Sequence, residues 1–314
     1  MLDLINRYCH GFVALPVINS IRQEGIFELF KNSESVEFET VLKHYPANKA
    51  YMKVAFRLLE SLEILQFNGA YQTGKRFNWL DEIPADINTL LQLDILTGSI
   101  SPKANQLIDN WLALALKQGS VNDSMLADYL DGLILIPLLL HNRISNEVEE
   151  SFADRFDFLL DSGRLEALFL AKGWVVKQPE KTVFTCAGEH FLDRIFIAGT
   201  VYSYQPMLRG MSELLFGDAS KVFQRDDEGH ELHLDRLMNV QGSGFQHGRY
   251  FNDCQEIIAD IFNQLPVENQ PDYIADMGCG DGSLLKRIYQ LILTETRRGE
   301  VLAEYPLLLI GADY

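Results

Sequence analysis

A glycine-rich turn between an apolar strand and an amphipathic helix is the feature that most constrains this chain of 314 residues. The segment DYIADMGCGDGSLLKRIYQLIL predicts a strand over 273–275 and a helix whose apolar face comes from residues 284–292. Between them, Gly278, Gly280 and Gly282 let the backbone turn sharply and approach a ligand without a Cβ in the way. The N-terminus of the following helix offers N–H groups to that ligand. The sequence therefore predicts a nucleotide-type binding loop in an α/β, Rossmann-like unit.

The spacing of the loop separates three classes of nucleotide site. A P-loop needs Gly-Lys-Ser/Thr at its end, but the first lysine after the loop is Lys286, inside the predicted helix. A dinucleotide loop follows G-x-G-x-x-G, and here Ser283 stands three residues after Gly280. Asp276, two residues before Gly278, is suited to orient the loop or to reach a bound amino group. These features favour the S-adenosylmethionine loop of class I methyltransferases.

A second apolar strand is predicted near the end of the chain, over 307–310, with Asp313 just beyond it. An acidic residue at the tip of the second strand of such a fold is suited to bind the two ribose hydroxyls of a nucleoside. The alternative is that Asp313 is an ordinary polar residue in the turn after a strand. The cofactor reading assigns Asp276, Asp313 and the three glycines to one site.

The first 80 residues predict a winged-helix domain. A helix is expected over 3–30, bent or divided by Pro16. A short helix then begins at Ser35, a second helix runs from Asn48 to about Leu62, and a hairpin turns at Asn68-Gly69. The second helix has a basic stripe, formed by Lys49, Lys53 and Arg57, and many apolar residues. Because the whole chain has a net charge of −17, this unit is expected to pack against protein rather than DNA.

The remaining sequence divides into three parts. Residues 81–216 predict a helical or lid region, with a possible second, degenerate winged unit over 152–187. Residues 217–250 are rich in Gly, Asp and His and predict a linker loop. Residues 251–314 predict the first part of a methyltransferase core, truncated after its second strand. The expected fold is thus mainly α at the N-terminus, followed by the start of an α/β Rossmann-like core.

Charge, cysteine content and hydropathy give no default membrane or nucleic-acid partner. Residues 1–80 carry nine basic and eight acidic side chains, so the remaining chain carries −18. The four cysteines have no metal-ligand spacing and suggest reduced thiols. The apolar run over 132–140 is shorter than the roughly 20 residues of a membrane span. We therefore expect a cytoplasmic protein.

Three histidines in the predicted linker are candidate site residues. His230 and His233 lie among several acids, as a metal site would require, but Gly229 and these acids are equally typical of a solvated loop, so no metal ligand is assigned. His247, flanked by glycine in FQHGRY, is a candidate to line the cofactor site, with anchoring of the loop as the alternative.

Several segments together resemble a known family. The segment SVEFETVLKHYPANKAYMKVAFRLLESLEIL followed by DMGCGDGSLL resembles small-molecule methyltransferases with an N-terminal winged or helical domain. More narrowly, INRYCHGFVALPVI and GSGFQHGRYF resemble the methyltransferase region that opens cyanobacterial polyketide synthase loading modules of the apratoxin and saxitoxin type.

The resemblance implies methylation of carbon in a malonyl-type unit held on an acyl carrier protein, among neighbouring polyketide synthase domains. It implies S-adenosylmethionine as cofactor and, in some members, a mononuclear iron or manganese ion that polarises the thioester. The cofactor loop maps onto Asp276, Gly278, Gly280 and Gly282. The ribose carboxylate maps onto Asp313, and Arg249 is placed to meet the methionine carboxylate.

The chain departs from the family at its C-terminal end, because the family core continues for several strands. We therefore expect an N-terminal half whose catalytic residues lie beyond Tyr314 and which is inactive alone; its oligomeric state is not predicted. Two other functions stay open at this point. One is O- or N-methylation of a small metabolite, and the other is a non-catalytic, methyltransferase-like scaffold.

Overall fold

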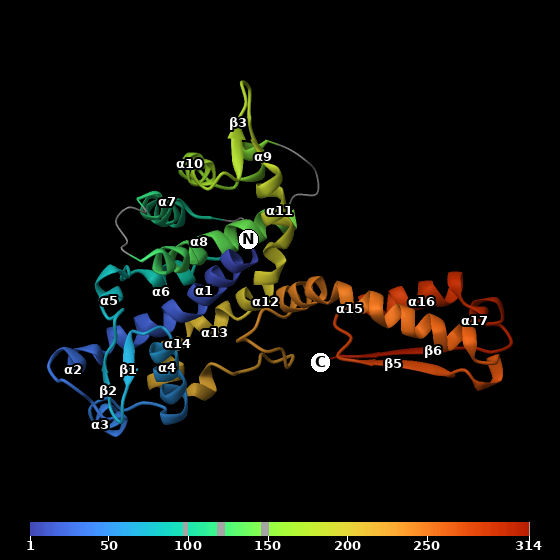
Figure 1. The fold of residues 1–314 in the computed structure, drawn as a ribbon, viewed down its shortest axis with the longest axis horizontal. Coiled ribbons are helices and arrows are strands. Elements are labelled where there is room, and N and C mark those ends of the chain that lie inside the picture. Colours follow the sequence, from blue (N-terminus) through green and yellow to red (C-terminus); the bar gives the residue numbers. More distant parts are fainter. Residues whose placement is uncertain (97–99, 118–122, 146–150, 314) are drawn as a thin grey trace. The chain divides into compact units, whose positions relative to one another are not determined.

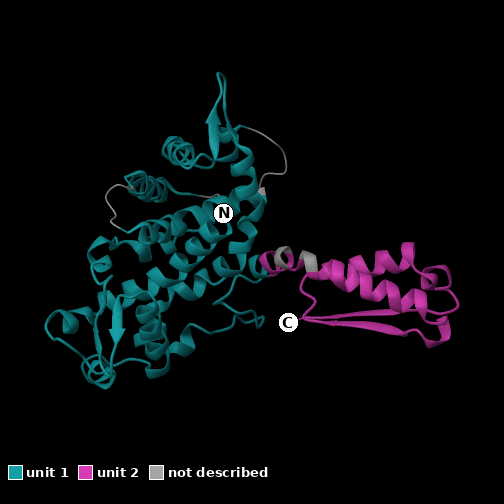
Figure 2. Cartoon of the chain, viewed as in Figure 1, with its two compact units in different colours: residues 1–239 teal, residues 240–314 magenta. Residues whose placement is uncertain are grey.

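The computed structural model describes residues 1–96, 100–117, 123–145 and 151–313, apart from the side chains of residues 145, 245, 246, 248 and 249. The chain forms two compact units, Met1–Asn239 and Val240–Tyr314 (Figure 2). Each unit has its own apolar cluster.

The first unit is mainly helical (Figure 1). In chain order its elements are α1 (Leu2–Gln23), α2 (Phe27–Lys31), α3 (Phe38–His44), α4 (Lys49–Ser61), β1 (Leu65–Phe67), β2 (Tyr71–Thr73), α5 (Trp79–Glu82), α6 (Ile87–Leu91), α7 (Pro102–Leu116) and α8 (Ser124–Ser145). They continue with α9 (Phe152–Arg155), α10 (Gly163–Ala171), β3 (Val175–Lys177), β4 (Thr182–Phe184), α11 (Cys186–Arg194), η1 (Ile195–Ala198), α12 (Gly199–Tyr202), α13 (Gln205–Arg209), α14 (Met211–Phe216) and η2 (Ala219–Lys221).

Helices α1 and α8 form the centre of the first unit and approach each other closely at two glycines. A Cβ placed on Gly11 would lie 2.3 Å from the Cα of Tyr129, and one placed on Gly132 would lie 2.6 Å from the Cα of Tyr8. Only glycine permits this backbone separation. Helix α1 continues through Pro16, so the expected division of the helix at this residue is wrong. The chain turns after the helix at Gly25, whose φ is +79°.

The first hairpin follows α3 and α4, in the order that the sequence predicts. Strands β1 and β2 pair antiparallel, and Val36 adds a bridge to Tyr71. Asn48 is the residue before α4, but its side chain does not cap that helix. Its amide instead donates to the carbonyl oxygens of Leu214 and Gly217, at 2.8 and 3.0 Å. The Asn48 side chain therefore joins the start of α4 to the end of α14.

The second hairpin repeats the local plan of the first. A residue with positive φ ends the preceding helical turn in each case: Glu63 at +59° before β1 and Gly173 at +70° before β3. Next to Gly173, the Lys172 ammonium lies 2.7 Å from the carboxylate of Asp131 on α8. The Asp131 side chain is only 2% exposed, so this ion pair joins the second hairpin to the central helix inside the core.

Helix α8 is also the one helix, within the described residues, that is long and apolar enough to cross a membrane, over Ser124–Ile144. Most of that window is buried inside the protein, as in a core helix.

The short helix expected to begin at Ser35 in fact begins at Phe38.

The second unit contains most of α15 (Arg236–Gln264), η3 (Val267–Asn269), β5 (Tyr273–Met277), α16 (Ser283–Glu295), α17 (Arg297–Glu300) and β6 (Leu308–Ala312). Strands β5 and β6 are parallel, with Tyr273 opposite Leu308. Phe262 of α15 packs with Ile288 and Ile292 of α16 to form the apolar cluster. The sequence's strand–helix–strand order is therefore a Rossmann-like βαβ unit.

The linker loop expected over 217–250 is wrong beyond residue 235, because α15 begins at Arg236. Asp235 supplies the missed start signal: its carboxylate accepts a hydrogen bond from the Met238 N–H at 3.0 Å. Three of the glycines that suggested a loop, Gly242, Gly244 and Gly248, lie inside the helix, where each costs about 1 kcal/mol relative to alanine.

The glycine contact between α1 and α8 predicts opposite effects of two Gly→Ala substitutions. Gly11→Ala should lower the free energy of unfolding by about 1–3 kcal/mol, because its Cβ overlaps the Tyr129 backbone. A Cβ on Gly244, in α15, meets no described atom within 4 Å, so Gly244→Ala should raise it by about 0.5–1 kcal/mol. Urea denaturation of both variants checks this, and equal effects would contradict the proposed close approach.

The buried ion pair predicts a large cost when one partner is removed. Lys172→Met should lower the free energy of unfolding by about 3–5 kcal/mol, because the buried Asp131 carboxylate loses the ammonium group that pairs with it. Lys31→Met breaks the exposed pair with Glu28 and should leave stability almost unchanged. Thermal unfolding followed by circular dichroism compares the two lysine variants.

Candidate functional site

The predicted cofactor residues come together at the carboxyl ends of two parallel strands. Asp276 lies opposite Gly311, and Met277 lies opposite Ala312, in the register of β5 and β6. The glycine loop follows β5 at that edge, and Asp313 follows β6 at the same edge. Ligands of open α/β sheets bind outside the carboxyl ends of strands, which is where this arrangement places the loop.

All three glycines of the loop need the conformational freedom of glycine. Their φ angles are +84° at Gly278, +57° at Gly280 and +75° at Gly282. Within the described residues, a Cβ on Gly278 or Gly282 would meet no atom within 4 Å, so the space beside them is open. A Cβ on Gly280 would lie 3.2 Å from a methyl group of Val240 on α15. The loop is therefore open beside Gly278 and Gly282 and covered by α15 at Gly280.

The end of β6 holds the glycine loop through its backbone N–H groups. Gly278 and Cys279 both donate to the carbonyl oxygen of Ala312, at 2.7 and 3.2 Å. The next N–H, of Gly280, donates to the Asp313 carboxylate at 2.5 Å. These three donors are consequently engaged within the protein and do not form a vacant anion cradle.

The two other acids of the motif have different surroundings. Asp281 accepts a hydrogen bond from the Ser283 N–H at 3.0 Å, and its hydrogen bonding to Ser283 lowers the pKa of this carboxyl below its usual value. This agrees with the helix-start role typical of aspartate. Asp276 is half-buried, and its carboxylate has no hydrogen-bond or ion-pair partner among the residues that the structure describes.

Gly311 and Val240, which sequence reasoning did not single out, shape the loop. A Cβ on Gly311 would lie 3.0 Å from the Sγ of Cys279 and 3.0 Å from a methyl group of Leu285. The lack of a Cβ at Gly311 therefore lets the loop and α16 close over β6. Val240 covers Gly280 from α15. The glycine in LLLIGADY was the available signal for the first contact. No sequence pattern pointed to Val240, since its segment was expected to be a linker.

The structure places His247 in α15 rather than in a loop. Its ring is exposed and lies 6.0 Å from the ring of Tyr250 and 6.3 Å from that of Phe251. Phe251 in turn faces the guanidinium of Arg287 on α16, at 5.5 Å. Among the described contacts, none joins His247 to the glycine loop. The side chain of Arg249 lies outside the described residues.

The described residues contain no group of three or more His, Cys, Asp or Glu side chains that could hold a metal ion. His230 is paired instead with Asp226 at 3.0 Å, and hydrogen bonds from the His230 backbone and ring lower the pKa of that carboxyl. Asp226 also accepts from the N–H of Glu228, which fits the solvated-loop interpretation of this segment. No residue set here fits the iron or manganese ion that the resemblance implies.

The hydrogen bond between β6 and the loop predicts a residue-specific exchange pattern. Asp313→Ala should accelerate hydrogen exchange at the Gly280 amide, since that N–H loses its carboxylate acceptor. Asp281→Ala should instead accelerate exchange at Ser283. Amide exchange followed by NMR distinguishes the two, and each variant is the control for the other. Unchanged exchange at Gly280 in Asp313→Ala would contradict the assignment.

Comparison with known families gives three matches along the chain. Residues 1–67 match the AprA N-terminal domain, residues 131–218 match the AprA winged helix domain and residues 231–314 match the AprA MT2-like domain. No curated protein matches the chain. The winged-helix match contains the second hairpin, whereas the first hairpin of the expected winged-helix domain over 1–80 falls partly within the AprA N-terminal match.

The third match covers β5, the glycine loop, α16 and β6, so the loop geometry and the methyltransferase match coincide. The order of the three domains agrees with the resemblance of the sequence segments. The chain therefore belongs to the AprA-type proteins, whose N-terminal, winged helix and MT2-like domains together match most of its length.

Proposed function

We propose that the glycine loop and Asp313 bind S-adenosylmethionine, and that the full-length protein methylates carbon in a malonyl-type acyl group on an acyl carrier protein. The observation that carries the cofactor proposal is the contact of the Asp313 carboxylate with the Gly280 N–H. It puts the acid at the tip of β6 against the loop, where a nucleoside on that loop would present its ribose.

The donor set of the loop fits a nucleoside better than a pyrophosphate. Three consecutive N–H groups already donate to Ala312 and Asp313. The Asp313 carboxylate has about four acceptor positions, of which the Gly280 N–H uses one. No described atom lies within 4 Å of a Cβ placed on Gly278 or Gly282, which leaves room for the ligand.

Charge favours the same ligand. Asp276 and Asp313 are acids at the same sheet edge, and residues 81–314 carry a net charge of −18. Such a field repels a dinucleotide's phosphates and attracts a cation. S-adenosylmethionine supplies a methyl group on a positively charged sulfonium. The partnerless Asp276 carboxylate is suited to accept a hydrogen bond from the ligand's ammonium group.

The substrate, the partners and the compartment rest on the family. AprA-type domains support a polyketide synthase setting with an acyl carrier protein and neighbouring synthase domains as partners. The four cysteines are free thiols, which supports a reducing, cytoplasmic setting. Lys49, in the basic stripe of α4, is paired with Glu39 at 2.5 Å, which weakens the case for a nucleic-acid partner. We derive no step through a metal ion, because no described residue set fits one.

Calorimetry on the full-length protein tests the cofactor site. S-adenosylmethionine should bind saturably, and Asp313→Ala should weaken binding by about 10–100-fold, since hydrogen bonds to a charged group contribute about 1.5–3 kcal/mol. Asp193→Ala, which removes an exposed acid on α11, is the control and should bind normally. Equal affinity in the Asp313 and Asp193 variants would exclude the assigned ribose contact.

Mass spectrometry of the carrier protein tests the reaction. Incubation of full-length protein, S-adenosylmethionine and malonyl-loaded carrier should add methyl mass to the carrier-bound acyl group. The acid that alkaline thioester hydrolysis then releases from the carrier should retain the methyl, as a C-methylated acid does. A methyl lost on hydrolysis would indicate O-methylation. Cofactor binding without transfer to any acyl carrier or small metabolite would favour the scaffold alternative.

A further inference from the structure

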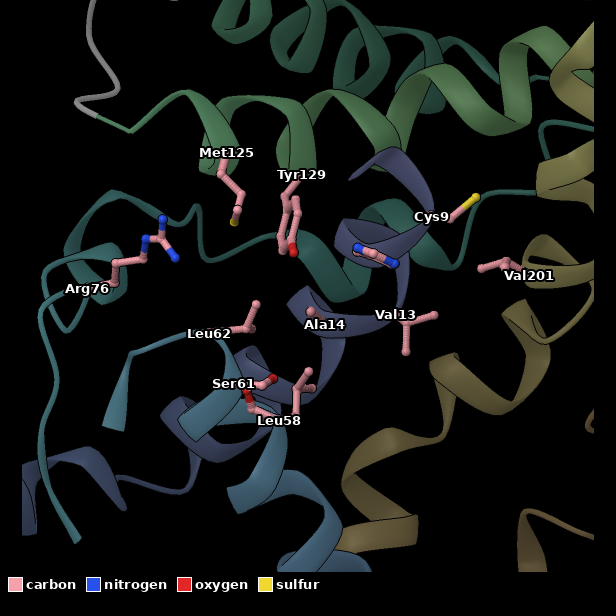
Figure 3. A pocket seen from close by; sticks show the side chains of 11 residues that line it. Cys9, Val13, Ala14, Leu58, Ser61, Leu62, Arg76, Met125, Tyr129 and Val201 are labelled. Carbon is pink, nitrogen blue, oxygen red and sulfur yellow. The ribbon is translucent and has the colours of Figure 1, made fainter. Parts of the chain in front are cut away.

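A cavity of about 480 Å³ opens in the first unit between α1, α4, α8 and α12, beside the contact between α1 and α8 (Figure 3). This volume falls within the range of roughly 300–1,000 Å³ typical of small-molecule sites. Its lining comes entirely from residues 9–201, so it is separate from the glycine loop.

The cavity wall is mainly apolar. Val13 and Ala14 come from α1, Leu58 from α4, Met125 from α8 and Val201 from α12 (Figure 3). These side chains belong to four helices that are distant in sequence. An apolar surface held open by separate packed helices favours a ligand that brings its own apolar body, since burial of apolar area drives such binding.

One buried polar group points into this apolar space. Tyr129 is 3% exposed, and its hydroxyl faces the cavity (Figure 3). Among the described residues, no hydrogen-bond partner of that hydroxyl is present. Burial raises the pKa of Tyr129, so the phenol is neutral and available as a donor. The hydroxyl oxygen is not wholly buried, so a ligand acceptor that fills the cavity would take the place of solvent at this group.

The charged group in the lining is already neutralised. Arg76 donates from Nε to the Asp123 carboxylate at 2.9 Å and from Nη1 to the Glu63 carboxylate at 3.0 Å. Glu63 also pairs with Lys75 at 2.5 Å, so two cations and two acids balance one another at that end of the cavity. A ligand carboxylate would find both cations already paired and would lose its hydration, so the cavity disfavours an anion.

We propose that this cavity binds an uncharged, mainly aliphatic small molecule whose single carbonyl oxygen accepts a hydrogen bond from Tyr129, the chemical class of an aliphatic ketone or ester. The apolar walls hold the chain, and the phenol fixes the carbonyl end. The site is independent of the proposed methyl transfer, because no cofactor residue takes part in it.

Ligand-observed NMR titration of the full-length protein with octan-2-one, without S-adenosylmethionine, tests the site. Octan-2-one should bind saturably, and octanoate at pH 8 should bind at least about tenfold more weakly, because a buried unpaired carboxylate is unfavourable. Tyr129→Phe should weaken octan-2-one binding by about threefold to tenfold, the range expected for one neutral hydrogen bond.

Two matched Val→Trp substitutions locate the binding to the cavity. Val13→Trp adds bulk to a partly exposed lining residue and should abolish binding. Val54→Trp changes an exposed valine of α4 outside the lining and should bind as the wild type does. Circular dichroism verifies that both variants fold. No saturable binding by octan-2-one, tighter binding of octanoate, or equal binding by the two tryptophan variants would overturn the proposal.

Discussion

The close contact of α1 with α8 is the constraint on which the first unit depends. Gly11 and Gly132 allow each helix backbone to touch the other at a tyrosine. Because the two helix backbones touch at Tyr8 and Tyr129, the side chains of these tyrosines pack to the sides of the contact and not between the helices. The ring of Tyr129 packs edge-on against Trp79 at 5.8 Å, and its hydroxyl reaches the cavity. One pair of small residues therefore sets both the central packing and the wall of the cavity.

The peripheral hairpins are joined to this centre by polar contacts that differ in kind. The first is held by the neutral amide of Asn48 on helix-end carbonyls, and the second by the charged pair of Lys172 and Asp131. The Asn48 amide donates hydrogen bonds to carbonyl groups at the end of α14, and the last carbonyls of any helix lack a partner within the helix. A buried ion pair depends on both of its charges. The two similar supersecondary units therefore have different sensitivities to substitution.

Local sequence patterns predicted the elements that depend on local chemistry. The glycine loop, the strands on either side of it and the hairpin at Asn68-Gly69 follow from residue types within short segments. The start of α15 was missed because glycine content outweighed the cap at Asp235. The cavity was not predictable, since it arises from four helices brought together in three dimensions. For the candidate site, Asp313 was placed correctly at the strand tip. Its hydrogen bond to Gly280, and the cover from Val240, are tertiary contacts that no local pattern encodes.

The anchoring of the glycine loop has a consequence for the order of folding. Gly280 and Asp313 are 33 residues apart, and the carbonyl that receives the Gly278 and Cys279 N–H groups also belongs to β6. During synthesis, the loop emerges from the ribosome before β6 does. Until β6 emerges and pairs with β5, three loop amides have only water to bind, and the positive φ angles have no external support. The binding loop is therefore completed only when a strand made after it has paired.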